Sequence, residues 1–177
     1  MIRCILFDRD GTLGSLRDDR YPATFTAFCP VRPVFEALRK RGYTVGILSN
    51  QSSIARGTGC GYDFDAEFRS YGADIWRICP HDTEDNCNCR KPKSGMLLSV
   101  AEELGVPLRE CVVIGDRLSD ILCAENVGAR GILVLTGKGE KEKETALAQF
   151  PNITVLSRFD EILPFLDQLD TETARIP

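Results

Sequence analysis

Two carboxylates lie one residue apart, directly after a short apolar run near the start of the chain. Asp8 and Asp10 follow Ile5-Leu6-Phe7, and Gly11 comes next. The run is apolar on both faces, which predicts a buried strand of a parallel sheet. Ligands of open α/β sheets bind outside the carboxyl ends of the strands, although an aspartate that closes a strand is often only a turn residue. One carboxylate could attack a substrate while the other transfers protons.

Polar residues also follow two later apolar runs. Ser49-Asn50 ends the run that begins at Tyr43, and Asp116 follows the run from Cys111 to Ile114. The Ser49 hydroxyl and the neighbouring N–H groups can donate hydrogen bonds to phosphoryl oxygens, with Asn50 beside them. Ser-Asn is also a common strand-to-loop ending without any function, and its place between two aspartate motifs favours the functional interpretation.

Basic residues that could balance phosphate charge lie beside these motifs. Lys91 supplies a point charge, and Arg90 can form a bidentate contact with a phosphate. Arg117 is either a further substrate contact or a surface arginine. Asp120 could hold Lys91 in place, or it could be an acidic residue in the first turn of a helix.

A separate group of cysteine and histidine side chains indicates a metal site. Its members share one polar loop and are Cys79, His81, Cys87 and Cys89. Four such ligands with no open position are typical of structural Zn²⁺, whereas the alternative is four unrelated buried residues. Bound zinc would fix the angle of Arg90 and Lys91, which follow directly. The other cysteines are expected in the core or to be incidental, and they are Cys4, Cys29, Cys60, Cys111 and Cys123.

The motifs resemble, in order, those of the haloacid dehalogenase-like hydrolases. The matching stretches are Asp8-Arg9-Asp10-Gly11-Thr12-Leu13, Ser49-Asn50-Gln51-Ser52, Arg90-Lys91-Pro92 and Gly115-Asp116-Arg117-Leu118-Ser119-Asp120. The zinc-ligand set and its flanking residues are similar to the branch that contains the D-glycero-D-manno-heptose 1,7-bisphosphate phosphatases and the histidinol-phosphate phosphatases. The resemblance covers nearly the whole chain.

This resemblance implies a role for each acidic residue. Asp8 would attack phosphorus to form an aspartyl phosphate. Asp10 would protonate the leaving alcohol and then take a proton from the water that hydrolyses the intermediate. Asp8, the backbone carbonyl of Asp10, and Asp116 would hold a catalytic Mg²⁺, because such a set of oxygen ligands suits magnesium better than a soft metal.

Strands and helices alternate along the chain, which predicts an α/β fold with a doubly wound, Rossmann-like parallel sheet. We expect no large cap domain, one domain over residues 1–170, and a tail without fixed structure over 171–177. An irregular flap is expected from Gly14 to Thr26. Ser119 is expected to cap the helix that begins at Leu118. The expected strands are 3–7, 43–48, 75–79, 111–114, 132–135 and 153–156, and the expected helices include 33–41, 64–71, 96–104, 118–127 and 161–169.

Composition excludes several classes of protein. The 177 residues are 43% hydrophobic and 27% charged, a balance typical of one globular core. The net charge is −4 without a basic stripe, which argues against nucleic-acid binding. No apolar stretch approaches the ~20 residues of a membrane span. No secretory segment accompanies the eight cysteines, so we expect reduced thiols and a cytoplasmic monomer.

These observations predict a magnesium-dependent phosphomonoester phosphatase that acts on a small phosphorylated metabolite, with a structural zinc loop. Removal of the 7-phosphate from heptose 1,7-bisphosphate is the leading hypothesis, and hydrolysis of histidinol phosphate is the alternative. Two further alternatives are a zinc-stapled binding module without catalysis and a polynucleotide 3′-phosphatase. The four residues Asp8, Asp10, Lys91 and Asp116 weigh against the first, and the acidic charge balance weighs against the second.

Overall fold

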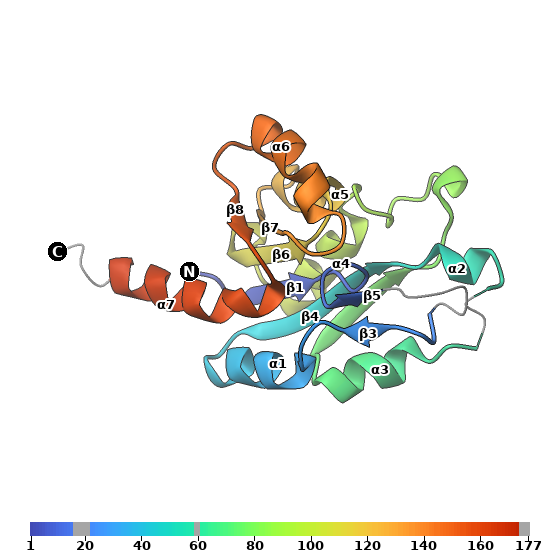
Figure 1. Cartoon of the computed structure of the whole chain (residues 1–177), viewed down its shortest axis with the longest axis horizontal. Coiled ribbons are helices and arrows are strands. Elements are labelled where there is room, and N and C mark those ends of the chain that lie inside the picture. The colour runs from blue at the N-terminus through green and yellow to red at the C-terminus, as the bar shows by residue number, and fades with distance from the viewer. Residues whose placement is uncertain (16–21, 59–60, 174–177) are drawn as a thin grey trace.

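A six-stranded parallel sheet forms the centre of the computed structural model, which describes residues 1–15, 22–58 and 61–173. The order across the sheet is β5-β4-β1-β6-β7-β8 (Figure 1). The strands are β1 (Cys4–Phe7), β4 (Thr44–Asn50), β5 (Ile75–Cys79), β6 (Cys111–Gly115), β7 (Arg130–Val134) and β8 (Thr154–Leu156). The chain first builds outward from β1 through β4 to β5, and then returns to the other side of β1 for β6. The predicted doubly wound sheet is confirmed, and its switch point lies at β1.

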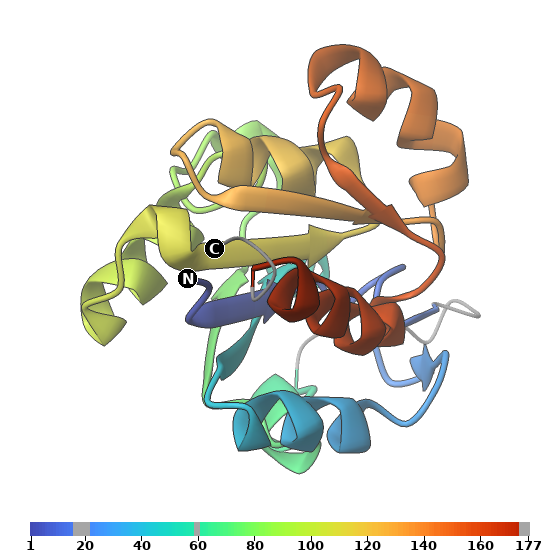
Figure 2. The same cartoon turned by 90° about the vertical axis from the view of Figure 1, so that its left-hand side faces the viewer.

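Helices cover both faces of this sheet (Figures 1 and 2). One face packs against α1 (Val31–Lys40), α3 (Phe64–Tyr71) and α7 (Ile162–Thr173). The other face packs against α4 (Gly95–Leu104) and α5 (Leu118–Glu125), with α6 (Gly139–Gln149) beside α5. The described residues also form the short helix α2 (Ser52–Ala55) and the 3-10 turns η1 (Thr83–Asp85), η2 (Leu108–Glu110) and η3 (Phe159–Glu161).

Strand β1 is buried on both faces, as its apolar sequence predicts. Ile5 and Phe7 belong to the core beneath α1, α3 and α7, whereas Cys4 and Leu6 belong to the core beneath α4 and α5. The Phe7 ring stacks on Phe35 of α1 with 5.0 Å between the ring centroids. This anchoring on two sides fixes the position at which β1 ends and Asp8 begins.

Two local predictions were wrong. Part of the segment expected to be an irregular flap forms an antiparallel pair of strands, β2 (Gly14–Ser15) and β3 (Thr26–Ala27). The pairing depends on long-range backbone hydrogen bonds that have no sequence periodicity; residues 16–21 of the flap lie outside the described part of the chain. The α5 helix is capped by the Asp120 side chain, which accepts from the Arg117 N–H at 3.1 Å, and Ser119 lies inside the helix.

The domain boundary and tail remain predictions. Helix α7 continues to Thr173, beyond the expected boundary at residue 170, and residues 174–177 lie outside the described residues. Within the described ranges, no helix combines the length and the apolar character needed to cross a membrane.

Candidate active site

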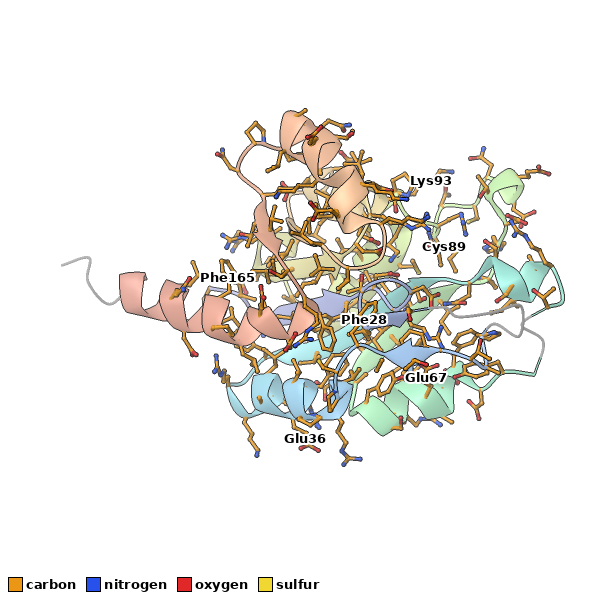
Figure 3. The ribbon with its side chains drawn as sticks, viewed as in Figure 1. Phe28, Glu36, Glu67, Cys89, Lys93 and Phe165 are labelled. Carbon is orange, nitrogen blue, oxygen red and sulfur yellow. The ribbon has the colours of Figure 1, made fainter. Side chains whose placement is uncertain are left out.

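A cleft of about 830 Å³ opens at the carboxyl edge of the sheet, the right-hand end in Figure 1. Its walls come from the segments that follow β1, β4, β5 and β6, so the topology alone gathers distant parts of the sequence here. Figure 3 labels Cys89 and Lys93 on the segment after β5 that borders this edge. The predicted site residues that line the cleft are Asp8, Asp10, Asn50, Cys87, Arg90, Lys91 and Arg117.

Lys91 lies at the centre of a buried group of charges. Its Nζ atom is 2.7 Å from Asp8 Oδ1 and 2.6 Å from Asp120 Oδ1, and it donates a hydrogen bond of 2.7 Å to the Leu48 carbonyl. Burial alone would lower the pKa of the Lys91 ammonium, but Asp120 and Asp8 outweigh burial and raise that pKa above its ordinary value. Asp120 therefore fills both roles that the sequence allowed: it holds Lys91, and it caps the first turn of α5.

Burial raises the pKa of the Asp8 carboxyl well above its ordinary value, and Lys91 acts in the opposite direction. Asp116 is similarly enclosed, and burial raises its pKa to about 6 although the Lys138 N–H donates to Asp116 Oδ2 at 2.8 Å. Thr12 Oγ1 donates to the other Asp116 oxygen at 3.3 Å. A Cβ atom at Gly137 would come within 2.1 Å of Asp116 Oδ2, so only glycine allows the loop after β7 to pack here.

Three buried carboxylates converge in this cluster. One oxygen from each of Asp8, Asp116 and Asp120 lies within 4.8 Å of the others. Lys91 supplies one positive charge against three carboxylates, and buried charges need compensation by partners or by a metal ion. The oxygen-only donor set fits a hard cation such as Mg²⁺. Asp8 and Asp116 were predicted for this site, while sequence analysis did not select Asp120 as a possible ligand.

Asp10 is held on both of its carboxylate oxygens. Gln51 Nε2 donates to Asp10 Oδ2 at 2.7 Å, and the Arg9 guanidinium donates to Asp10 Oδ1 at 2.6 Å. Gln51 Nε2 also lies 2.7 Å from Ser49 Oγ, which is fully buried. Ser49 is thus linked to Asp10 through Gln51, but it is not among the residues that line the cleft, and its predicted contact with phosphate stays a prediction.

Three residues of the site, Arg9, Gln51 and Glu67, were not predicted from the sequence. Arg9 is fully buried between the two motif aspartates, and Glu67 on α3 accepts from it over a sequence separation of 58 residues. A charged residue inside a buried motif was the available signal for Arg9. Nothing in the sequence marked Glu67, which looks like an ordinary acidic residue in the first turn of a helix.

The four predicted zinc ligands come together. Five pairs among their donor atoms, three thiol sulfurs and His81 Nδ1, lie 3.3 to 3.6 Å apart. Tetrahedral ligands about 2.3 Å from zinc would be about 3.8 Å apart, so the cluster needs little expansion to hold the ion. Soft sulfur and imidazole donors in this arrangement fit Zn²⁺ and not Mg²⁺.

The same loop connects the cysteine and histidine cluster to the cleft. Arg90 donates to Ser52 Oγ at 2.8 Å and to the His81 carbonyl at 3.2 Å. Asn50 exchanges two hydrogen bonds of 3.1 Å with the backbone of Lys91. The contact that the structure gives Asn50 therefore positions Lys91, whereas the sequence favoured phosphate binding.

Arg117 and the remaining cysteines complete the predicted set. Arg117 is exposed and lines the cleft. Of the cysteines outside the metal cluster, Cys4, Cys111 and Cys123 are buried and Cys29 is half-buried. Cys60 lies outside the described residues.

The chain is similar to known hydrolases and phosphatases. A family model described as HAD-hydrolase-like matches residues 88–162. A D-glycero-β-D-manno-heptose-1,7-bisphosphate 7-phosphatase of Neisseria meningitidis serogroup A is 34% identical over 185 residues, which cover 98% of this chain and 97% of that protein. The equivalent protein of Pseudomonas putida is 33% identical over 95% of this chain and 99% of its own length.

A solved structure is similar over the same extent. The D,D-heptose 1,7-bisphosphate phosphatase of B. bronchiseptica, complexed with magnesium and phosphate, superposes with a TM-score of 0.79. It is 29% identical, and the match covers 94% of this chain and 99% of that one.

Replacing the buried lysine should destabilise the protein strongly. Lys91→Met leaves the Asp8 and Asp120 carboxylates without their cation, and breaking a buried ion pair in this way costs about 3–5 kcal/mol of unfolding free energy. Lys93→Met is the matched control, because Lys93 is exposed and should change stability by less than about 0.5 kcal/mol. Urea unfolding without added Mg²⁺ measures both; equal stability of the two variants would contradict a charge-balancing role for Lys91.

Proposed function

The chain belongs to the haloacid dehalogenase-like hydrolases, and we propose that it removes the 7-phosphate from D-glycero-β-D-manno-heptose 1,7-bisphosphate. The observation that supports this most directly is the position of Asp8, buried at the end of β1 and 2.7 Å from the Lys91 ammonium. A carboxylate and an ammonium together at the wall of a cleft suit attack on an anionic phosphoryl group.

In the proposed mechanism, Asp8 is the nucleophile. A bond forms between an Asp8 oxygen and phosphorus while the bond from phosphorus to the leaving sugar oxygen breaks, which gives an aspartyl phosphate. Lys91 favours the ionised form of Asp8 and balances charge on the phosphoryl oxygens. The Ser49 hydroxyl accepts a hydrogen bond from Gln51 Nε2 and can itself donate one.

Asp10 is proposed to manage protons in both halves of the reaction. It gives a proton to the leaving oxygen in the first half and takes one from the attacking water in the second. Each oxygen of a carboxyl group has two lone-pair positions, so the Arg9 and Gln51 hydrogen bonds still allow Asp10 to carry a proton.

Asp8, Asp116 and the Asp10 backbone carbonyl are proposed to hold Mg²⁺, with Asp120 close enough to assist in balancing charge. The bound ion would supply Lewis-acid stabilisation of phosphoryl charge. The cluster of Cys79, His81, Cys87 and Cys89 is proposed to hold structural Zn²⁺. Its purpose would be to keep Arg90 and Lys91 at the cleft.

Further cations line the cleft beyond Lys91 and favour a substrate with a second phosphate. Arg56, Arg90 and Arg117 are the arginines among its lining residues. Arg90 is already directed by Ser52 and the His81 carbonyl, whereas Arg117 is exposed at the start of α5. A bisphosphate could place one phosphate at Asp8 and the other among these side chains.

The substrate can be tested with a panel of phosphate esters in Mg²⁺. We expect the highest kcat/KM for heptose 1,7-bisphosphate, with heptose 1-phosphate as product, and a raised KM for heptose 7-phosphate because it lacks the second phosphate. Phosphate release and product analysis measure this. Faster turnover of histidinol phosphate or of a 3′-phosphorylated oligonucleotide would overturn the proposed substrate, and inactivity on every ester would overturn the proposed activity.

Substitution of the two motif aspartates should separate their roles. Asp8→Asn should abolish turnover, because an amide is a poor nucleophile, while Asp10→Asn should reduce kcat by on the order of 10²–10⁴-fold. Asp63→Asn is the control, since this exposed residue caps α3 and asparagine caps equally well. Near-normal activity of Asp8→Asn would contradict the nucleophile assignment.

Removing each metal should have a different consequence. Withdrawal of Mg²⁺ should stop turnover at once and its return should restore it, because carboxylate-bound magnesium exchanges readily. Cys87→Ser should lower zinc content, melting temperature and activity together, whereas Cys29→Ser, outside the cluster, should change none of them. Elemental analysis is expected to find one zinc per chain; a zinc-free protein with full activity and stability would show that the cluster is incidental.

A further inference from the structure

Arg9 is a fully buried cation that the chemistry at Asp8 does not require. Its guanidinium forms a fork with the Glu67 carboxylate, with Nε 2.9 Å from Oε1 and Nη2 2.9 Å from Oε2. Its remaining terminal nitrogen, Nη1, donates to Asp10 Oδ1 at 2.6 Å. One planar group thus joins helix α3 to the residue proposed as the acid and base.

Aromatic rings and hydroxyl groups hold this contact rigidly. The guanidinium carbon lies 3.9 Å from the centre of the Phe25 ring, in the segment that leads into β3. The Tyr62 and Tyr71 hydroxyls each donate to Glu67 at 2.8 Å, one to each carboxylate oxygen. Glu67 lies on α3 on the side of strand β3 (Figure 3). Both partners of the Arg9–Glu67 pair are therefore fixed by several contacts, which gives the pair little freedom to rotate.

We propose that Arg9, Glu67, Tyr62 and Tyr71 are positioning residues for Asp10, and this inference rests on the proposed function. Together with Gln51 on the other oxygen, they set the orientation of the Asp10 carboxyl group towards the leaving oxygen. During the first step the phosphorus–oxygen bond to the sugar breaks, its electron pair goes to the leaving oxygen, and the Asp10 proton binds there. The quality of that proton transfer depends on the angle at which Asp10 is held.

A comparison of leaving groups isolates this role. An alkyl phosphate needs a proton on its poor leaving oxygen, whereas an aryl phosphate with a nitrophenol leaving group departs without one. The ratio kcat/KM reports only the steps up to departure of the leaving group, so later hydrolysis of the aspartyl phosphate does not enter. A misplaced Asp10 should therefore impair the alkyl ester and spare the aryl ester. A distorted site, or loss of Asp8, should impair both.

The experiment measures kcat/KM for a sugar phosphate and for p-nitrophenyl phosphate. Glu67→Gln should lower the value for the sugar phosphate by on the order of 10–10²-fold while changing the aryl ester by less than about 3-fold. Asp10→Asn gives the full size of the effect in the same direction. Tyr71→Phe removes one hydrogen bond to Glu67 and should give a smaller loss with the same selectivity, and it serves as the test if Glu67→Gln does not fold.

Glu36→Gln is the matched control. Glu36 lies on α1, and its side chain is 43% exposed and pairs with Arg32, so the same chemical change there should leave both esters unaffected (Figure 3). Equal losses on both esters in Glu67→Gln and Tyr71→Phe, or no loss on either, would overturn the positioning role. Failure of the unaltered protein to hydrolyse any phosphate ester would instead overturn the proposed function, which keeps the two failures distinct.

Discussion

Three carboxylates and one ammonium group are buried together where β1, β6 and the loop after β5 meet. Among the described residues, Lys91 is the one lysine within hydrogen-bonding distance of Asp8 and Asp120, and Asp116 lies close to both carboxylates. Burial raises the pKa of the Asp8 and Asp116 carboxyl groups, because their charged forms lose hydration there. Such a cluster is stable only with cationic partners, so charge balance connects stability to function here.

The rest of the structure keeps this cluster in place. Helices cover both faces of β1, and this packing fixes the backbone position of Asp8, which follows the strand. The Asn50 side chain forms two hydrogen bonds with the backbone of Lys91. The cysteine and histidine cluster lies just before Lys91 in the same loop. Asp120 joins the cluster to the first turn of α5 through its bond to the Arg117 N–H. Each of these contacts restricts the conformational freedom of a residue that holds a buried charge in place.

Periodicity and motif order predicted the sheet, its helices and the convergence of Asp8, Asp116 and Lys91, because strand ends in a parallel sheet share one edge. The hairpin of β2 and β3 could not be predicted, since its pairing is long-range and its strands are only two residues each. The ion pair of Arg9 and Glu67 could not be predicted for the same reason, because the two residues are 58 positions apart in the sequence. The prediction that Ser119 caps α5 was wrong, because the Asp120 side chain accepts the hydrogen bond at this end of the helix and also contacts Lys91.

Mg²⁺ binding tests most directly whether the excess of buried carboxylates is a cation site. Isothermal titration calorimetry of the zinc-loaded protein should give one Mg²⁺ per chain, and Asp116→Asn should lose most of that affinity because it removes one of the buried oxygen ligands. Asp63→Asn should bind as the unaltered protein does. Unchanged Mg²⁺ affinity in Asp116→Asn, or no binding by the unaltered protein, would contradict the account.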